Sequence, residues 1–421
     1  MVNDSKARFR ESGSKLSANT CEIAHGGRGY IWLSSERGSP LLTLDTAARY
    51  RHLFPVFDRV TYINSCSQGA LAYQVRAALD EYLDGMESEG ALWDLWVTKQ
   101  EEVRGLIAKV FGTSESKVAV TPSASAALNS LMSAFDFSRG RKKIITTSLE
   151  FPTLGQIAHA QELRGARVVH IAAETDNTLD LAKLEKAIDE DTALVAVTHV
   201  CYRNGAMTDI KSVVEMGHRH GVPVLVDAYQ SGGAMPISFD SLGADFLIGG
   251  GHKYLLTTPG LGFLLVNGNS KFIPTNTGWF AARDIFAMDI FNYDPSQDAR
   301  RFEGGTPPIP TLYASAAGIK LLLDVGISEA WAHTREVHRQ LREGLTALRA
   351  QVATPSGDGN HAAMIAVKTK DEHAMVNALH KERLVVSSRD GNLRISPHFY
   401  NNHQDVDRIL AAIHKHRNLL A

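Results

Sequence analysis

Short apolar runs alternate with amphipathic segments along much of the chain. Most of these runs are rich in Val and Ile, and they occupy Val118–Val120, Ile144–Thr147, Val168–Ile171, Leu194–Val200, Val222–Val226, Phe246–Ile248 and Phe263–Val266. Apolar residues at successive positions are typical of strands buried on both faces of a parallel sheet. We therefore predict one large sheet between residues 118 and 266.

Helical segments fall between most of these strands. They are predicted near 123–136, 154–164, 180–189 and 210–220, and two more precede the sheet, at 70–84 and from about 91 to 110. In the first of these two, Leu71, Val75, Leu79 and Leu83 form one apolar stripe. The repeated order of strand, helix and strand predicts an α/β fold with a large, doubly wound, mostly parallel sheet.

The pattern changes after residue 270. Gly and Pro residues mark 270–310 as loops near a domain boundary. Helices then follow near 311–325, 328–350, 371–381 and 404–418, with strands near 362–367, 385 and 393–396. We predict an N-terminal arm over 1–40, a large domain over 41–300 and a small C-terminal α+β domain over 301–421. The first 30 or so residues of the large domain could instead join the small one.

Composition narrows the class of protein. The chain is 44% hydrophobic and 21% charged, which is typical of globular domains. Its formal net charge of −2 argues against a nucleic-acid or anionic-membrane partner, and no apolar run is long enough to span a membrane. Three scattered cysteines indicate a reducing compartment. With no signal-peptide pattern in the first 20 residues, we expect a cytoplasmic protein.

The strongest chemical signal lies within 222–266. One buried strand ends at Asp227, and another leads through Gly249–Gly251 to His252 and Lys253. Because ligands gather at the carboxyl ends of strands in open α/β sheets, a carboxylate and an amine are expected at one rim. Glycines there would let the backbone approach a bound group closely. Desolvation can lower the pKa of such a lysine, which suits it to attack a carbonyl carbon.

The pairing of D-A-Y-Q at 227–230 with G-G-G-H-K at 249–253 resembles the class V aminotransferase group of pyridoxal-phosphate enzymes. This group has fold type I and includes cysteine desulfurases, kynureninases and isopenicillin-epimerase-like proteins, and the resemblance extends from Tyr62 to Leu410. It implies pyridoxal 5'-phosphate as cofactor, bound to Lys253 as an internal aldimine. Asp227 would pair with the pyridine nitrogen and Gln230 would donate to the phenolic oxygen.

The same resemblance implies where the cofactor phosphate binds. A strand-to-helix turn contains Ser123, Ala124 and Ser125, and the free N–H groups of a helix start favour an anion. A serine there can equally be an ordinary helix cap. His252 would add a contact, and a second subunit would contribute Trp279 and Thr306. We therefore expect a homodimer with shared active sites, although Trp279 could instead pack in the core.

Other matches concern the ring and the substrate. Phe151, in a turn resembling the F-P-[ST] turn of kynureninases, would stack on the pyridine, with ordinary core packing as the alternative. In L-R-I-S, Arg394 matches the family arginine that binds the substrate carboxylate. Tyr202 and Asn64 would line the substrate pocket, and Arg389 could contact a distal substrate group.

Cys66 has no activating partner in the sequence, so we expect it to be buried and inert. No metal site is predicted.

The resemblance leaves the reaction open. Our first hypothesis is an aminotransferase acting on an α-amino acid. A kynureninase-like C–S or C–C lyase or hydrolase is the second, and an epimerase that uses His199 or Tyr202 as a second acid or base is the third. A protein that binds without turnover is disfavoured by the intact Lys253, Asp227 and Arg394. Because 384–394 contains no cysteine, desulfurase chemistry is also disfavoured.

Overall fold

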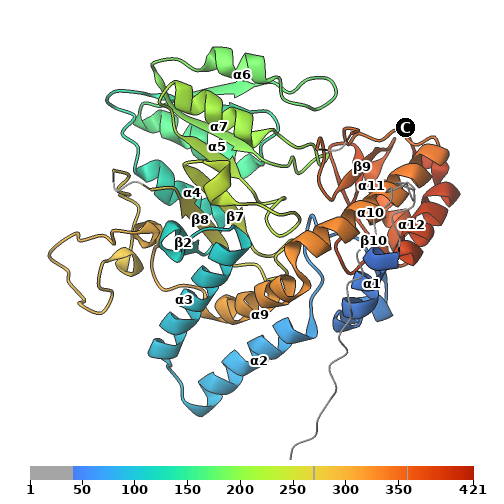
Figure 1. Ribbon diagram of the computed structural model, residues 1–421, viewed down its shortest axis with the longest axis horizontal. Coiled ribbons are helices and arrows are strands. Elements are labelled where there is room, and N and C mark those ends of the chain that lie inside the picture. Colours follow the sequence, from blue (N-terminus) through green and yellow to red (C-terminus); the bar gives the residue numbers. More distant parts are fainter. Residues whose placement is uncertain (1–40, 269–270, 358) are drawn as a thin grey trace, which may run out of the picture. The chain divides into compact units, whose positions relative to one another are not determined.

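A seven-stranded sheet lies at the centre of the larger part of the structure, which is a computed structural model describing residues 41–268, 271–357 and 359–421 (Figure 1). The strand order is β2-β8-β7-β6-β5-β3-β4. The strands are β2 (Val118–Thr121), β3 (Lys143–Thr147), β4 (Arg167–Ile171), β5 (Thr192–Thr198), β6 (Val224–Asp227), β7 (Phe246–Gly250) and β8 (Gly262–Val266). All adjacent pairs are parallel except the two that involve β8. The predicted large, mostly parallel sheet is confirmed.

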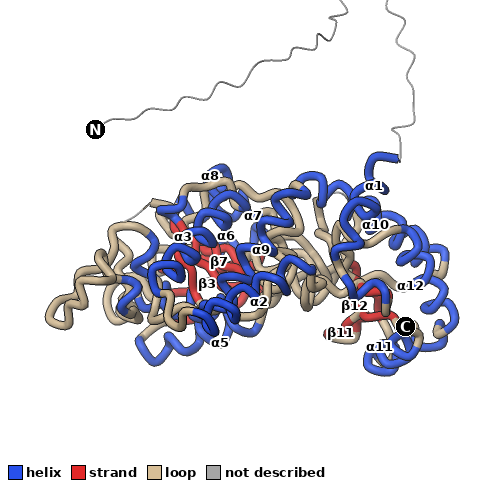
Figure 2. Tube along the Cα trace, turned by 90° about the horizontal axis from the view of Figure 1, so that it is seen from below, coloured by secondary structure: helices blue, strands red, loops and turns tan. Residues whose placement is uncertain are grey.

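Helices cover both faces of this sheet (Figure 2). Strand residues alternate between two apolar cores, so that Val195 and Val197 of β5 face one core while Leu194 and Ala196 face the other. The helices of this part are α2 (Tyr73–Ser88), α3 (Trp93–Val110), α4 (Ala124–Ser133), α5 (Pro152–Ala160), α6 (Leu181–Ala187), α7 (Ile210–Arg219), α8 (Phe239–Leu242) and α9 (Ile309–Val325). Burial on both faces explains the continuous apolar runs in the sequence.

No helix crosses between β7 and β8. The connection, residues 251–261, is a loop, and β8 returns antiparallel to β7. A parallel return needs a crossover of a dozen or more residues, usually with a helix, so this short link favours antiparallel pairing. The loop begins at the carboxyl end of β7 and contains Lys253.

The C-terminal part forms its own layer. Strands β11 (Ser387–Arg389), β12 (Asn392–Ile395) and β9 (Ile365–Lys368) make an antiparallel sheet packed with α10 (Ile327–Ala347), α11 (Glu372–Lys381) and α12 (His403–Lys415). Two early segments lie beside them: α1 (Leu41–Tyr50) contacts α10, and β1 (Thr61–Tyr62) pairs with β10 (Leu384–Val385). A smaller domain with an antiparallel sheet is confirmed. The exact domain boundaries remain a prediction.

The segment 271–308 has the irregular structure that its Gly and Pro content predicts. It contains two of the short 3-10 turns. These turns are η1 (Arg51–Leu53), η2 (Pro55–Asp58), η3 (Glu115–Lys117), η4 (Gln161–Arg164), η5 (Trp279–Ala281), η6 (Ala299–Phe302) and η7 (Arg417–Leu419). The predicted N-terminal arm over 1–40 lies outside the described residues.

The helix predicted at 70–84 is confirmed as α2, and its apolar stripe is only partly buried. Val75 is fully buried, but Leu71 and Leu83 are 46% and 54% exposed. The helix begins at Tyr73, so Leu71 precedes it, and Tyr73 itself is 52% exposed. The periodicity thus marks a helix, but half of its apolar stripe faces away from the core of this chain.

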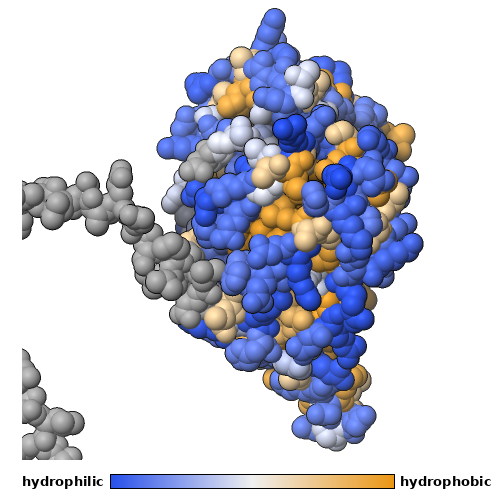
Figure 3. Space-filling view, turned by 90° about the vertical axis from the view of Figure 1, so that its right-hand side faces the viewer, coloured by the Kyte–Doolittle hydropathy of each residue, from blue (hydrophilic) through white to orange (hydrophobic). Residues whose placement is uncertain are grey.

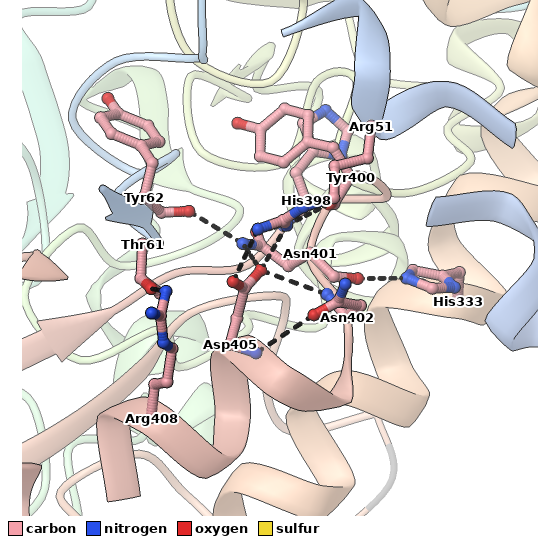
Figure 4. Close-up of polar contacts among 10 residues, drawn as sticks. All are labelled: Arg51, Thr61, Tyr62, His333, His398, Tyr400, Asn401, Asn402, Asp405 and Arg408. Atoms are coloured by element: carbon pink, nitrogen blue, oxygen red, sulfur yellow. Dashed lines mark hydrogen bonds and ion pairs between the residues drawn. The ribbon is translucent and has the colours of Figure 1, made fainter. Parts of the chain in front are cut away.

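A polar network joins the early segments to the C-terminal layer (Figure 4). Asn401 is its centre: its side chain donates to the carbonyl of Tyr62 at 2.8 Å and to Asp405 at 2.9 Å. Asp405 also accepts two hydrogen bonds from Arg51, at 2.6 and 2.9 Å. The adjacent Tyr400 hydroxyl lies 2.7 Å from Ser65 Oγ and accepts from the Ala70 amide at 3.2 Å. The network therefore fixes the loop 64–70.

Among the described residues, no single helix is long and apolar enough to cross a membrane. The helices α9 and α10 meet that test only as a pair, and they are bent by 75° at their junction. Figure 3 views the structure from the side of α10 and α12, where apolar side chains gather near the middle of a mostly hydrophilic face.

Candidate functional site

A cavity of about 390 Å³ lies at the carboxyl ends of the central strands. The C-terminal layer supplies its remaining wall through β11 and β12. Its lining residues are Cys66, Ser67, Ser123, Ala124, Ser125, Phe151, Thr153, Leu154, Thr198, Val200, Tyr202, Asp227, Tyr229, Gln230, Ile248, His252, Lys253, Arg389 and Arg394. Ten of the thirteen residues predicted for the cofactor and substrate therefore border one space.

Asp227 and Lys253 meet in this cavity, as their positions after β6 and β7 predict. The Asp227 carboxylate is 7% exposed and accepts a hydrogen bond from the Tyr229 amide at 2.9 Å. Lys253 Nζ lies 4.4 Å from the Tyr229 ring centroid and 5.8 Å from that of Phe151. Burial lowers the pKa of Lys253 to about 8, although Asp227 opposes the shift. The neutral, nucleophilic form of this amine is thus easier to reach than that of an exposed lysine.

The glycines before Lys253 have a different role from the one expected. A Cβ at Gly250 would lie 2.3 Å from the Tyr229 ring, and one at Gly249 would lie 2.4 Å from the Phe263 ring. These distances are far below van der Waals contact, so the protein's own aromatic rings occupy the space. The glycines let Tyr229 pack beside Lys253 rather than admitting a bound group.

The predicted anion site is the first turn of α4. Ser123 is the N-cap and accepts a hydrogen bond from the Ala126 amide at 3.1 Å, so the cap reading of this serine is also correct. The turn packs directly on β8: a Cβ at Gly262 would lie 2.1 Å from the Ser123 carbonyl carbon. The remaining N–H groups and the helix dipole leave this end suited to a phosphate.

His252 stands on the same side of the cavity. Its Nδ1 lies 3.0 Å from the Tyr229 hydroxyl. Burial, followed by the positive charge of Lys253, lowers the pKa of His252 to about 4. The imidazole is therefore neutral at physiological pH and acts as a hydrogen-bonding group rather than as a cation.

Phe151 is 43% exposed and lines the cavity, so the core-packing alternative is wrong. It is the N-cap of α5, and Pro152 at the first helical position fixes the turn. The Tyr202 ring meets it edge-on with the centroids 5.0 Å apart. The Phe151 ring therefore borders the same cavity as Asp227 and is partly exposed there.

Arg394 is held in a defined orientation on β12. Its guanidinium donates to the Tyr202 carbonyl at 2.8 Å, to Ser387 Oγ at 3.0 Å and to Ser67 Oγ at 3.2 Å. The side chain is 4% exposed, and its Nε has no acceptor among the described residues. A buried donor without a partner is costly, and a carboxylate in the cavity would satisfy it.

Gln230 also has spare hydrogen-bonding capacity. Its Nε2 donates to the Cys66 carbonyl at 3.1 Å, which leaves the second N–H of the amide free to donate. In the part of the chain that the structure describes, its buried Oε1 has no partner. The second N–H and the Oε1 atom of this amide are thus both left for a ligand in the cavity.

The structure does not bring three predicted residues to the cavity. Asn64 forms a backbone bridge with Ser396, and Ser67 lines the cavity instead. Trp279 packs against Trp93 and Phe280, with centroids 5.8 and 4.4 Å away. Thr306 lies exposed in the loop before α9. A role for Trp279 or Thr306 needs a second subunit and stays a prediction.

Sequence reasoning assigned no role to eight of the lining residues, among them Tyr229, Thr198, Ser67 and Cys66. Tyr229 stands inside the D-A-Y-Q motif but was given no role. Thr198 ends β5 and is in register with Asp227 on β6, a pairing that the strand ends could have indicated. Ser67 holds Arg394. Cys66 is buried, at 1% exposed, as expected, and it borders the cavity.

Comparisons with known proteins agree with this geometry. The family described as aminotransferase class-V matches residues 73–409. An uncharacterized aminotransferase of Bacillus subtilis, YcbU, is 33% identical over 87% of this chain and 98% of its own length. A kynureninase of Pseudomonas fluorescens is 27% identical over 80% of this chain and 83% of its own. Proteins named probable cysteine desulfurases are similar too, at 25–27% identity.

Solved structures share the fold. A mutant of the protein C-DES with glycine covalently linked to its pyridoxal-phosphate cofactor superimposes with a TM-score of 0.80. It covers 86% of this chain and 98% of that one at 20% sequence identity.

Proposed function

Since this chain belongs to the class V aminotransferase family, we propose that it is an aminotransferase of an α-amino acid, with Lys253 binding the cofactor and Arg394 the substrate carboxylate. Like its relatives it is an enzyme whose cofactor is pyridoxal phosphate. The observation that carries the proposal is one cavity lined by a lysine, a buried carboxylate and a buried arginine.

The residues present fit this cofactor. Its phosphate matches the first turn of α4, its pyridine nitrogen matches Asp227, and its phenolic oxygen matches the free N–H of Gln230. Phe151 would cover the ring, and the lowered pKa of Lys253 keeps the amine nucleophilic toward the aldehyde. When bound, the cofactor supplies an electron-withdrawing ring that stabilises negative charge at the substrate Cα.

Each side chain then has a definable task. The Asp227 carboxylate holds a proton on the ring nitrogen. With the substrate bound, Lys253 Nζ would move a proton to or from Cα as general base and acid. Arg394, fixed by Ser67, Ser387 and Tyr202, orients the carboxylate so that the Cα–H bond faces Lys253.

The test is a panel of amino acids added to the holoenzyme without a 2-oxo acid. We expect a subset to convert the cofactor to its amine form, seen as loss of the visible absorbance, and a 2-oxo acid to restore it. Arg394→Gln should weaken amino-acid binding about 10- to 100-fold while the cofactor stays bound, because a charged hydrogen bond is lost. A spectrum that no amino acid changes, or unchanged affinity in the variant, would contradict the proposal.

A kynureninase-like lyase is the second candidate. The turn Phe151-Pro152-Thr153 at the cavity and the kynureninase relative favour it. Release of pyruvate, ammonia and the corresponding thiol from S-substituted cysteines, with no amine form of the cofactor, would replace the first proposal with this one. Desulfurase chemistry stays disfavoured, because β11 and β12 are joined by Asp390 and Gly391 alone, which leaves no loop for a mobile cysteine.

We also propose a homodimer in which Trp279 and Thr306 reach the partner's cofactor. Large apolar side chains are exposed on α2, on α3 and in the loop before η6: Tyr73, Leu83, Met86, Trp93, Leu95, Phe286, Met288, Ile290, Phe291 and Tyr293. Large apolar side chains left exposed in this way are candidates for burial at a subunit interface. Light scattering should give twice the 46.0 kDa mass of one chain, and a monomer that binds cofactor fully would refute shared sites.

A further inference from the structure

The charges that line the cavity do not balance once the proposed ligands are placed. The basic side chains are those of Lys253, Arg389 and Arg394, and Asp227 is the carboxylate among the lining residues. The cofactor takes Lys253 and Asp227, its phosphate takes the α4 turn, and the substrate α-carboxylate takes Arg394. Arg389 is left as a cation without an assigned anion.

The β11–β12 hairpin places Arg389 beside Arg394. Ser387 is paired with Arg394, and Arg389 with Asn392. Paired residues of an antiparallel ladder share a face, and so do residues two apart on one strand. Arg389 and Arg394 therefore project from the same face, as diagonal neighbours with Cβ atoms about 7–8 Å apart.

The hairpin is a rigid support. Its two turn residues, Asp390 and Gly391, have φ of 56° and 76°, the left-handed conformations that a two-residue type I′ turn requires. The Asp390 carboxylate accepts from Arg203 at 3.4 Å, and Arg203 also donates to the Ser148 carbonyl. The turn is thus tied to the strand ends across the cavity mouth, and Asp390 already has a cationic partner.

The Arg389 guanidinium itself is exposed and ready for a ligand. Within the described ranges, no carboxylate or carbonyl oxygen accepts a hydrogen bond from it, whereas Arg394 has three acceptors. It is close enough to Lys253 to disfavour the charged form of that amine. A planar guanidinium offers a fork of donors that matches a carboxylate or a sulfinate.

We propose that Arg389 binds a second anionic group of the substrate, so that the enzyme selects α-amino acids with an acidic side chain. This rests on the proposed function, because Arg394 must hold the α-carboxylate for Arg389 to meet the other end. Side-chain carboxylates and sulfinates share the required chemistry. Neutral amides of the same size lack the charge that Arg389 recognises.

The test compares each acid with its amide. The holoenzyme is titrated with L-aspartate and L-asparagine, and with L-glutamate and L-glutamine, following the change in the cofactor's visible spectrum at equilibrium. A parallel titration with cysteine sulfinate shows whether the second anionic group that Arg389 prefers is a sulfinate or a carboxylate. We expect at least one acid to bind about 10- to 100-fold more tightly than its amide, the size of one charged hydrogen-bonding pair.

Arg389→Gln should bring that ratio close to one, and Arg389→Lys should keep part of it. Arg139→Gln is the matched control, since it removes the same charge from an exposed loop before β3, at the opposite end of the strands. A wild-type ratio near one, or a ratio that survives in Arg389→Gln, would overturn the inference while leaving the proposed function intact. A cofactor spectrum that neither acids nor amides change would overturn the proposed function as well.

Discussion

Lys253→Ala should abolish the absorbance band of the lysine-bound cofactor in the purified enzyme and lower its turnover by about 10²- to 10⁴-fold. The variant loses both the amine that binds the cofactor aldehyde and the general base at the substrate Cα. Absorbance spectra of protein purified with added cofactor, together with turnover of an active amino acid from the panel, measure both effects.

Lys381→Ala is the control, because that lysine is exposed near the end of α11, away from the cavity. It should keep the spectrum and the rate of the wild type. Retained colour and turnover in Lys253→Ala would show that another amine performs the chemistry, and circular dichroism of both variants guards against misfolding as the cause of a loss.

Asp227→Asn should retain bound cofactor but lose turnover by about 10²- to 10³-fold. Breaking a buried charge pair costs about 3–5 kcal/mol, and here the lost partner is the group that holds the ring nitrogen protonated. Burial already raises the pKa of Asp227, so its charge depends on the cation that it meets in the cavity.

The readout is the separation of cofactor binding from turnover. A merely structural carboxylate would release the cofactor when replaced, whereas a positioning role on the ring nitrogen leaves it attached to Lys253. Asp240→Asn, an exposed aspartate of α8, should change neither. Full activity in Asp227→Asn would remove this residue from the mechanism.

The sequence was most informative for the buried strands and for the reactive residues at their carboxyl ends. Continuous apolar runs such as that of β5 predicted strands buried on both faces, and the ends of β6 and β7 predicted that Asp227 and Lys253 share a rim. Both inferences depend only on the geometry of parallel strands. Arg394 came from a family resemblance, and no periodicity would have found it.

What the sequence could not predict depends on distant partners. The strand β1 has two residues and exists because it pairs with β10, over 300 positions later, so no local pattern marks it. The glycines before Lys253 were expected to make room for a ligand. The Tyr229 ring fills that space instead, and its position depends on tertiary packing that the sequence does not show. The stripe on α2 did not indicate which of its residues are buried, because a periodicity does not tell whether the same chain covers it.

Reduction of the holoenzyme with borohydride, followed by peptide mass spectrometry, tests directly the claim that Lys253 binds the cofactor. Reduction makes the bond between cofactor and amine permanent, so the modified residue can be located in the digest. We expect the mass added by the reduced cofactor on the peptide that contains Lys253 and on no other lysine. A modification located elsewhere, or none in a coloured protein, would contradict it.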